Sequence, residues 1–527
     1  MFRLVLSILL ALGAAVPSHA TRYYVDAGAT GSATGLSWAN AFTGLQEALS
    51  VVIPGDEIWV AAGQYKPTTG TNRTIAFNLR NGVDVYGGFA GTETHPDERD
   101  IAGNPTVLNG DIGEPGTSGD NSRSVVKAAN INTAIILDGF RIMNGYSQSG
   151  SSYDGGGLNV QHTLNGNLLV RNCNFVNNYS GTYGGAIYMA AANLTLERCE
   201  FNSNSAGTGG DGGAIYNGNN NGGYSTLEVR DCVFKNNTAR RGASIHGGLD
   251  FDQLFIDRCI FTNNTSPLSI FEVDGFAGAV VRNSYFIGNT VNGSTSNIFR
   301  VQASLASEVL TMANCTFTQN YNLYASPGSE MIRVYGTHHR IVNSIVYGNT
   351  PYAGRQVSTG MGISSSIVQG GHGGGTAIID ADPLFTAPHT GAPGNFDATL
   401  YDYTVQPGSP AVNAGENALV NPSSVLDLAG APRIQGGTVD LGCYESDGTV
   451  SVPEPMWPGP WYYDAGNQEL HLAFSGAGVQ GTVEVFTLDG RLLLRTYARS
   501  GILPLNLRPG LYVARAAGHA PLRFMVP

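Results

Sequence analysis

A short phrase recurs along the chain from Ile135 to Gly371 and strongly limits what this chain can fold into. Its copies read IILDGFRIMNG, LLVRNCNFVNN, LTLERCEFNSN, LEVRDCVFKNN, LFIDRCIFTNN, AVVRNSYFIGN, LTMANCTFTQN, HRIVNSIVYGN and GISSSIVQGG. When the copies are aligned, one position is filled in turn by Phe140, Cys173, Cys199, Cys232, Cys259, Ser284, Cys315, Ser344 and Ser366. Successive members of this column lie 22 to 33 residues apart, and a repeat of that length indicates a solenoid.

Each copy has the alternation of a strand with one buried face. In LEVRDCVFKNN the pattern points Leu227, Val229, Cys232 and Phe234 inward after one slip in phase. Turn-forming residues follow, and an Asn recurs three positions after the aromatic slot, as Asn178, Asn204, Asn237, Asn264, Asn289, Asn320 and Asn349. Equivalent residues of successive coils stack about 4.8 Å apart. We therefore expect these Asn side chains to hydrogen-bond along the stack and to tolerate left-handed backbone angles at the corner.

A second phrase lies between the copies of the first, beginning at Gly155, Gly184, Gly212 and Gly242. Glycine at these positions allows a sharp turn into the next short strand. Strands that return to one sheet through crossovers of this length form a right-handed solenoid. The fold class predicted from both phrases is all-β, a right-handed parallel β-helix.

Cysteine usage and net charge limit the expected disulfide bonding and the expected partners. Five of the six Cys residues lie in the repeat column, where Ser and Phe also occur, which favours packing over disulfide bonding. Cys443 is out of register, so no particular pairing follows from the count. The net charge of −12 disfavours binding to nucleic acid or to an anionic membrane.

The ends of the chain differ in character from the repeats. Residues 1–20 read as a signal peptide, with an apolar run that is too short to span a bilayer, so we expect no transmembrane segment in the mature chain. Residues 21–447 are assigned to the β-helix: a helix over Phe42–Val52 is expected to cap it, and Thr92–Gly119 is expected to be a loop. Residues 448–460 form a Pro-rich linker, and 461–527 read as about seven short strands of a small β-sandwich.

Motifs near both ends of the solenoid resemble those of a known family. They are Tyr24-Val25-Asp26, Ser37–Phe42, Gly55–Gly63, Val85–Phe89, Asp382–Phe385, Tyr403–Gly415 and Val439–Glu445. Together they resemble secreted bacterial β-helix proteins of the choice-of-anchor type, and the repeats resemble those of polymorphic outer-membrane proteins. The resemblance covers residues 22–446. It implies a right-handed, pectin-lyase-like parallel β-helix that is exported or attached to the outer surface of a bacterium, and it carries no catalytic residues to transfer.

The last block resembles the C-terminal sorting domain of the type IX secretion system. The matching residues are Val485-Phe486 with Gly490-Arg491, and Leu507 to Val513. The chain departs from that family at its end, where Phe-Met-Val-Pro follows Arg523. The resemblance implies a partner in the secretion machinery. The alternative is an ordinary carbohydrate-binding or spacer sandwich.

One group of residues would suit catalysis on a polysaccharide. The residue before each glycine phrase is Asp154, Tyr183, Asp211 and then Arg241. If these stack, Asp154 and Asp211 lie two coils apart, about 9.6 Å, near the carboxylate separation of an inverting glycosidase. Solvated turn residues flanking glycine would give the same pattern.

A second group would suit a cation. Asp250, Asp252, Glu272 and Asp274 would offer oxygen ligands to calcium if they stacked on one side, although the regular Asp-x-Asp-x-Asp-Gly loop is absent. Tyr183, Tyr188, Tyr216 and Tyr224 would form a strip for stacking on sugars if they were exposed, and corner packing explains them equally well.

Two functions follow from these patterns. The first is a non-enzymatic surface protein, monomeric, acting as an adhesin, a glycan-binding protein or a structural stalk. The second is a polysaccharide lyase or glycoside hydrolase acting in a lateral groove near residues 154–241. Low charge and long regular stacks favour the first, and neither function requires a cofactor other than the calcium considered above.

Overall fold

The computed structural model describes residues 20–148, 155–218, 225–248, 251–294, 296–302, 308–323, 330–336, 338–351, 355–446 and much of 461–526. The expected signal peptide, apart from Ala20, and the expected linker lie outside these residues. The chain forms two compact units, Met1–Thr449 and Val450–Pro527, which are described separately.

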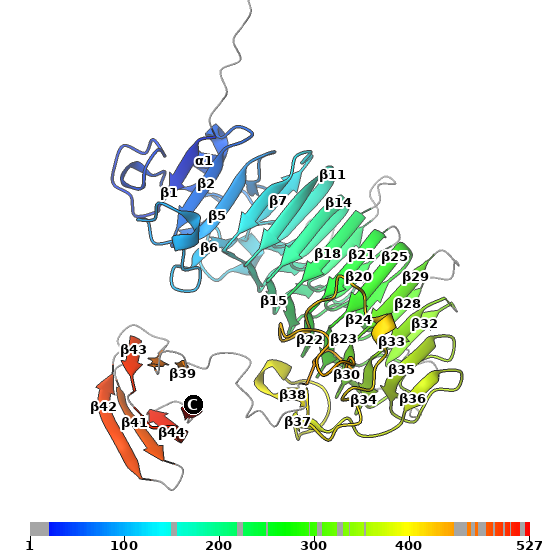
Figure 1. Ribbon diagram of the computed structural model, residues 1–527. Coiled ribbons are helices and arrows are strands. Elements are labelled where there is room, and N and C mark those ends of the chain that lie inside the picture. Colours follow the sequence, from blue (N-terminus) through cyan, green and yellow to red (C-terminus); the bar gives the residue numbers. More distant parts are fainter. Residues whose placement is uncertain are drawn as a thin grey trace, which may run out of the picture. The chain divides into compact units, whose positions relative to one another are not determined.

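The first unit is a parallel β-helix whose 30 described sheet strands join into one continuous sheet (Figure 1). The predicted fold class is thereby confirmed. The first face of the helix consists of β1 (Arg22–Val25), β2 (Glu57–Ala61), β5 (Asp84–Phe89), β8 (Ile135–Asp138), the later parts of β11 (Leu158–Arg171) and β14 (Ile187–Glu197), β18 (Ser225–Arg230), β21 (Phe251–Asp257), β25 (Phe276–Arg282), β29 (Val309–Ala313), β33 (Arg340–Val342) and β35 (Gly362–Val368).

Two further faces complete each coil. The second consists of β3 (Gly63–Tyr65), β6 (Thr106–Asn109), β9 (Phe140–Met143), β12 (Asn174–Val176), β15 (Glu200–Asn202), β19 (Val233–Lys235), β22 (Ile260–Thr262), β26 (Tyr285–Ile287), β30 (Thr316–Thr318) and β34 (Ile345–Tyr347). The third consists of β4 (Phe77–Asn78), β7 (Val126–Ala129), the earlier parts of β11 and β14, β17 (Ile215–Gly218), β20 (Ile245–Gly247), β24 (Ser269–Val273), β28 (Asn297–Gln302) and β32 (Ile332–Tyr335).

Short ladders mark the corner between the second and third faces. They comprise β10 (Tyr146–Ser147), β13 (Tyr179–Ser180) and β16 (Ser205–Ala206), then β23 (Thr265–Ser266), β27 (Thr290–Val291) and β31 (Tyr321–Asn322). The last rung of the helix is β36 (Thr376–Ile379), which pairs with β35.

The interior follows the repeat register read from the sequence. Leu227, Val229, Cys232 and Phe234 are all buried, as predicted. The aromatic column forms a continuous stack with near-parallel rings and centroid separations of 4.4 to 4.9 Å, running through Phe175, Phe201, Phe234, Phe261, Phe286 and Phe317. All six Cys residues are free and buried, which agrees with the packing prediction.

The recurring Asn residues form the predicted ladder, with one correction. The Nδ2 group of Asn237 donates to Oδ1 of Asn264 at 3.0 Å and to the main-chain oxygen of Phe201 at 2.9 Å, and the pattern repeats along the column. The left-handed angle, however, falls on the preceding residue, for example Asn236 and Asn263. The ladder residues themselves do not adopt a positive φ.

The N-terminal end contains one confirmed element and two that sequence patterns missed. Helix α1 (Leu45–Val51) covers the first coil with Leu45, Ala48 and Leu49, as predicted. The first rung is β1, which pairs with β2 ahead of the strands expected from Asp56 onward. The expected loop at 92–119 contains β6, which pairs with β3 and β9 between the short helices η2 (Pro96–Glu98) and η3 (Ser118–Asp120). Four residues are too few for alternation to reveal a strand inside a Pro/Gly-rich segment.

A closing segment, residues 382–446, runs back along the outside of the second face (yellow to orange in Figure 1). It contains β37 (Phe385–Ala387), η5 (Ala398–Leu400), β38 (Asp402–Val405) and η6 (Asn417–Leu419). Its apolar side chains pack on Tyr285, Ile287, Ile345 and Ile367, whose side chains point out of the helix. The segment thereby seals the outer surface of these coils.

The second unit contains seven described strands in two sheets, which agrees with the predicted small β-sandwich. One sheet has β39 (Trp461–Asp464), β40 (Glu469–Leu472) and β43 (Gly501–Pro504), and the other has β42 (Leu492–Ala498), β41 (Gly481–Thr487), β44 (Gly510–Ala516) and β45 (Leu522–Val526). Leu470 of the first sheet and Val483, Val485 and Phe524 of the second share one buried core. In the described part of the chain, no helix is both long and apolar enough to cross a membrane.

Candidate functional site

The described residues that directly precede the glycine phrases lie side by side on successive coils, as the sequence predicted. Tyr183 pairs with Asp211, and Asp211 pairs with Arg241, each through a parallel bridge between neighbouring coils. Asp154 lies outside the described residues, so the proposed pair of carboxylates two coils apart stays a prediction.

Asp211 is buried and held between two guanidinium groups. Arg240 Nη2 lies 2.9 Å from Oδ1, and Arg241 Nη2 lies 2.8 Å from Oδ2. The hydrogen bonds from Arg240 and Arg241 all go to Oδ2, which anchors the two arginines, whereas the buried Oδ1 has no hydrogen-bond partner among the described residues. A glycosidase carboxylate needs an oxygen that is open to the substrate or to water.

Arg241 joins two groups that the sequence had kept apart. Its Nη1 atom lies 3.6 Å from Asp274 Oδ2 and 3.8 Å from Glu272 Oε1, on the next coil. Burial opposes the charge of this guanidinium, but the hydrogen bonds to Asp211 and the charges of Glu272 and Asp274 outweigh it and raise the pKa of Arg241. A raised pKa disfavours Arg241 as the base that a lyase requires, and its catalytic role stays a prediction.

The acidic residues expected to bind calcium are only partly described. Glu272 is fully buried and accepts hydrogen bonds from Ser269 Oγ and from Gln302 Nε2, and the same Nε2 atom donates to Asp274 at 3.0 Å. Asp250 and the side chain of Asp252 lie outside the described residues. Within the described part of the chain, no group of three or more His, Cys, Asp or Glu residues is placed to hold a metal ion. Calcium binding at this position therefore stays a prediction.

Asp274 is the group at this site that titrates nearest to neutral pH. Burial, together with the negative charge of Glu272, raises the pKa of its carboxyl to about 6. Its side chain is 19% exposed, so solvent reaches it, whereas Glu272 beside it is sealed. A carboxyl with a pKa near the working pH suits proton transfer.

The raised pKa of Asp274 predicts a pH-dependent stability. Because the folded-state pKa lies above the ordinary value of 3.8, the folded state binds the proton more tightly than the unfolded state. The resulting stabilisation is complete below about pH 4 and is lost as pH rises through about 6, a change of roughly 2–3 kcal/mol. We expect Asp274→Asn to remove this change from urea-unfolding curves between pH 4 and 7. The exposed Asp97→Asn variant should keep it, and equal pH profiles for wild type and Asp274→Asn would refute the assignment.

The tyrosines form a stack that only partly matches the expected strip. The Tyr183 and Tyr216 rings are 4.3 Å apart, both half-buried, and Tyr216 stacks on His246 at 5.4 Å. Tyr188 is fully buried, so it cannot stack on a sugar, and Tyr224 lies outside the described residues. Of the three described tyrosines, Tyr183 and Tyr216 are therefore partly accessible to a ligand.

Sequence reasoning missed four members of the site: His246, Arg240, Arg300 and Gln302. His246 is buried, its Nδ1 atom has no hydrogen-bond partner among the described residues, and burial with the charges of Arg241, Arg240 and Arg300 lowers its pKa well below the ordinary value. A signal was available for two of them, since His246 and Arg300 share one outward column of the third face. The column comprises Tyr188, Tyr216, His246, Glu272, Arg300 and Arg333.

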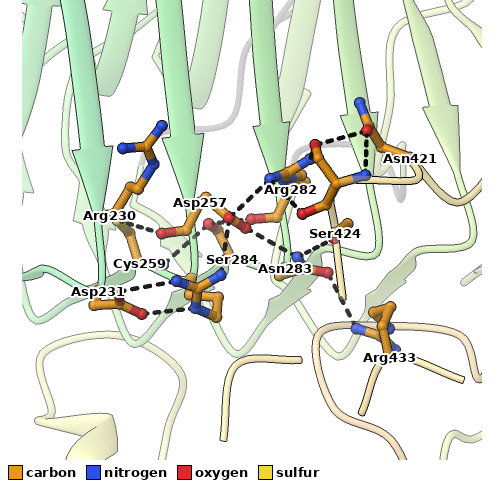
Figure 2. Close-up of polar contacts among 12 residues, drawn as sticks. Arg230, Asp231, Asp257, Cys259, Arg282, Asn283, Ser284, Asn421, Ser424 and Arg433 are labelled. Carbon is orange, nitrogen blue, oxygen red and sulfur yellow. Dashed lines mark hydrogen bonds and ion pairs between the residues drawn. The ribbon is translucent and has the colours of Figure 1, made fainter. Parts of the chain in front are cut away.

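A second polar cluster lies where the closing segment meets the helix (Figure 2). Asp257 accepts from Arg282 Nη2 at 3.1 Å and from Asn283 Nδ2 at 2.9 Å, and Asn283 also donates to Ser424 of the closing segment. On the other side, Arg433 Nη1 donates to Asn283 Oδ1 at 3.2 Å. These groups are buried and bonded to one another, so the cluster fastens the closing segment to the helix.

Comparison with known proteins adds little beyond the fold. No protein-family model matches the chain, and no curated protein matches it. The solved structure titled "Crystal structure of pectate lyase Pel9A" is similar at 12% identity and a TM-score of 0.42, covering 81% of this chain and 97% of that one. A rhamnogalacturonan lyase is similar at 15% identity and a TM-score of 0.39, covering 69% and 85%. At these values the likeness bears on neither substrate nor reaction, and the β-helix is established by the strand register described above.

Proposed function

We propose that the protein is an exported, monomeric β-helix protein of a bacterial cell surface that binds or displays polysaccharide without cleaving it. The observation that carries this proposal is the pairing of the charged groups on the third face. Asp211 and Arg241, which catalysis would need to be open, are bonded to each other, and Arg241 also faces Glu272 and Asp274. What this face leaves for a ligand is the half-buried ring pair of Tyr183 and Tyr216.

Export and display form part of the same proposal. Residues 1–20 would direct the chain out of the cytoplasm, and the sandwich at 461–527 would act as the sorting domain that the secretion machinery recognises. The seven described strands of that unit and its separate core are compatible with such a role.

Glycan binding without cleavage is the expected result for the purified chain, residues 21–527. We expect retention on a glycan array, no new reducing ends, and at least about tenfold weaker binding in Tyr216→Ala, which is about 1.4 kcal/mol. Tyr347→Ala, which removes a tyrosine from the second face, is the matched control and should bind normally. Equal loss in both variants would show that the third face is not the binding surface.

The alternative function, a polysaccharide lyase or glycoside hydrolase, is favoured by one observation. Asp274 has a pKa of about 6 and is partly open to solvent, as a general acid requires. Reducing ends or unsaturated products formed by wild type and lost in Asp274→Asn would replace the binding proposal with this one.

A further inference from the structure

Besides the buried hydroxyls of Ser122 and Ser124, the connection between β6 and β7 holds three buried carboxylate or amide oxygen atoms that have no hydrogen-bond donor among the described residues. They are Oδ1 of Asp111, Oδ1 of Asp120 and Oδ1 of Asn121. The Asn121 side chain is only 5% exposed. This connection is far along the chain from the acidic residues considered above.

The loop fixes one oxygen of each carboxylate and leaves the other open. Gly116 N donates to Asp111 Oδ2 at 3.1 Å, and Glu114 N donates to Asp120 Oδ2 at 2.8 Å. Both carboxylates are thus turned toward the chain between them. Gly113 allows this turn, since it adopts a φ of +67° and a Cβ there would lie 2.5 Å from Asp120 Oδ2.

A main-chain hydrogen bond closes the loop between Asp111 and Asn121. Ser122 N donates to Gly110 O at 2.9 Å, which sets Asn121 beside Asp111 across the two ends of the loop. The Asn121 Nδ2 group donates to Asn144 O at 2.8 Å, so the amide orientation is fixed and Oδ1 is the atom left without a partner.

Three such oxygens in one loop are unfavourable unless something positive binds them. A buried acceptor without a donor destabilises the folded chain, and more so when it is charged. Neither Asp111 nor Asp120 forms an ion pair with an arginine or lysine of the described residues. The nearby Arg73 donates instead to the main-chain oxygens of Asn121 and Tyr146, at 2.7 and 2.6 Å.

We propose that the loop from Asp111 to Asn121 binds a calcium ion through the two carboxylates and the Asn121 amide oxygen. Oxygen donors without nitrogen or sulfur select hard cations, and calcium accepts the irregular sets of 6–8 oxygens that loops provide. Main-chain oxygens and water would complete the coordination. A bound ion would fasten the segment between β6 and β7, and thereby the N-terminal coils.

Isothermal titration calorimetry of the full mature chain with CaCl2, after removal of metal with EDTA, tests the site. We expect one ion to bind with a dissociation constant on the order of 10⁻⁴ to 10⁻³ M, as in extracellular calcium modules. Asp120→Asn and Asp111→Asn should each weaken binding at least about tenfold, because each removes a charged ligand. Calcium should also protect residues 110–122 from proteolysis in wild type only.

Control variants distinguish the loss of the calcium site from a general loss of folding. Asp97→Asn removes the same charge from a nearby exposed residue and should bind calcium as wild type does. Asn121→Asp adds a carboxylate and should tighten binding, which a general loss of folding cannot imitate. The absence of binding in wild type at 10 mM CaCl2, a concentration about tenfold above the weakest expected constant, would overturn the proposal. So would binding that is lost in Asp274→Asn and kept in Asp120→Asn, since the ion would then lie at the third face.

Discussion

Replacing Arg433 by alanine is expected to lower the free energy of unfolding by about 3–5 kcal/mol, because it leaves a buried charge without its partner. Arg433 is 1% exposed and donates through Nε and Nη2 to Glu445, whose side chain is also sealed. Its Nη1 atom bonds to Asn283 of the helix (Figure 2), so the same guanidinium holds the closing segment to the coils.

Several buried carboxylates lie near Arg433, so its removal is expected to lower the stability of the fold strongly. Asp427 and Asp440 are buried nearby and, like Glu445, accept main-chain N–H groups. Glu445 bonds directly to Arg433, and the charge of Arg433 also acts on the carboxylates of Asp427 and Asp440. Burial raises the pKa of all three, and that of Glu445 reaches about 7.

The pH dependence distinguishes this effect from a packing defect. Below about pH 5, Glu445 is protonated in the folded state, so removal of Arg433 leaves no charge there and the loss of stability is smaller. At pH 8 the Glu445 carboxyl is ionised in the wild type, and the full loss appears because the variant must either bury that charge unpaired or protonate it. Hydrogen exchange should show the amides of residues 427–445 losing protection first.

Arg198→Ala is the matched control, since Arg198 is 52% exposed and its ion pair with Glu197 spans 3.8 Å. Exposed pairs contribute about 0–1 kcal/mol, so this variant should unfold nearly as wild type does. If Arg433→Ala and Arg198→Ala proved equally stable, or if the loss at Arg433 were independent of pH, the buried pair would not be what fastens the closing segment.

The sequence predicted the register of the β-helix because the interior repeats. Cys173 and Cys199, or Asn237 and Asn264, occupy equivalent slots in coils of unequal length, and each slot tolerates only a few residue types. Alternation within one coil shows which side chains point inward. The recurring glycine phrase carried the prediction that Tyr183, Asp211 and Arg241 lie in one column.

The side-chain contacts within the candidate site could not be predicted from the repeat pattern. Arg241 reaches Asp274 because a long side chain crosses from one column of the third face to the next, and a repeat pattern describes columns only. Arg433 meets Asn283 across 150 residues, in a segment that has no repeat. The one-residue shift of the left-handed angle at Asn236 depends on where the amide of Asn237 points, which composition does not specify.

A second large loss of stability is expected when a ring is removed from the centre of the phenylalanine stack. Phe261 is fully buried, with Phe234 at 4.8 Å and Phe286 at 4.4 Å on its two faces and Phe271 edge-on at 6.1 Å. Phe261→Ala removes a buried ring and leaves a cavity that neighbouring coils, fixed by their strand pairing, cannot close. We expect the free energy of unfolding to fall by about 3–5 kcal/mol.

Comparison with Phe175→Ala separates the contribution of ring stacking to stability from that of buried apolar area. Phe175 is equally buried but has one ring neighbour in the stack, Phe201 at 4.9 Å, since the coil before it carries Ile142 at that slot. Aromatic pairs add about 0.5–1.5 kcal/mol beyond the area they bury, so Phe261→Ala should be the more destabilising by about that amount in urea unfolding. Equal losses would mean that the column stabilises the helix through buried area alone. A smaller loss at Phe261 would mean that the central coils relax around the cavity, and the rigid stack would then not be what holds successive coils in register.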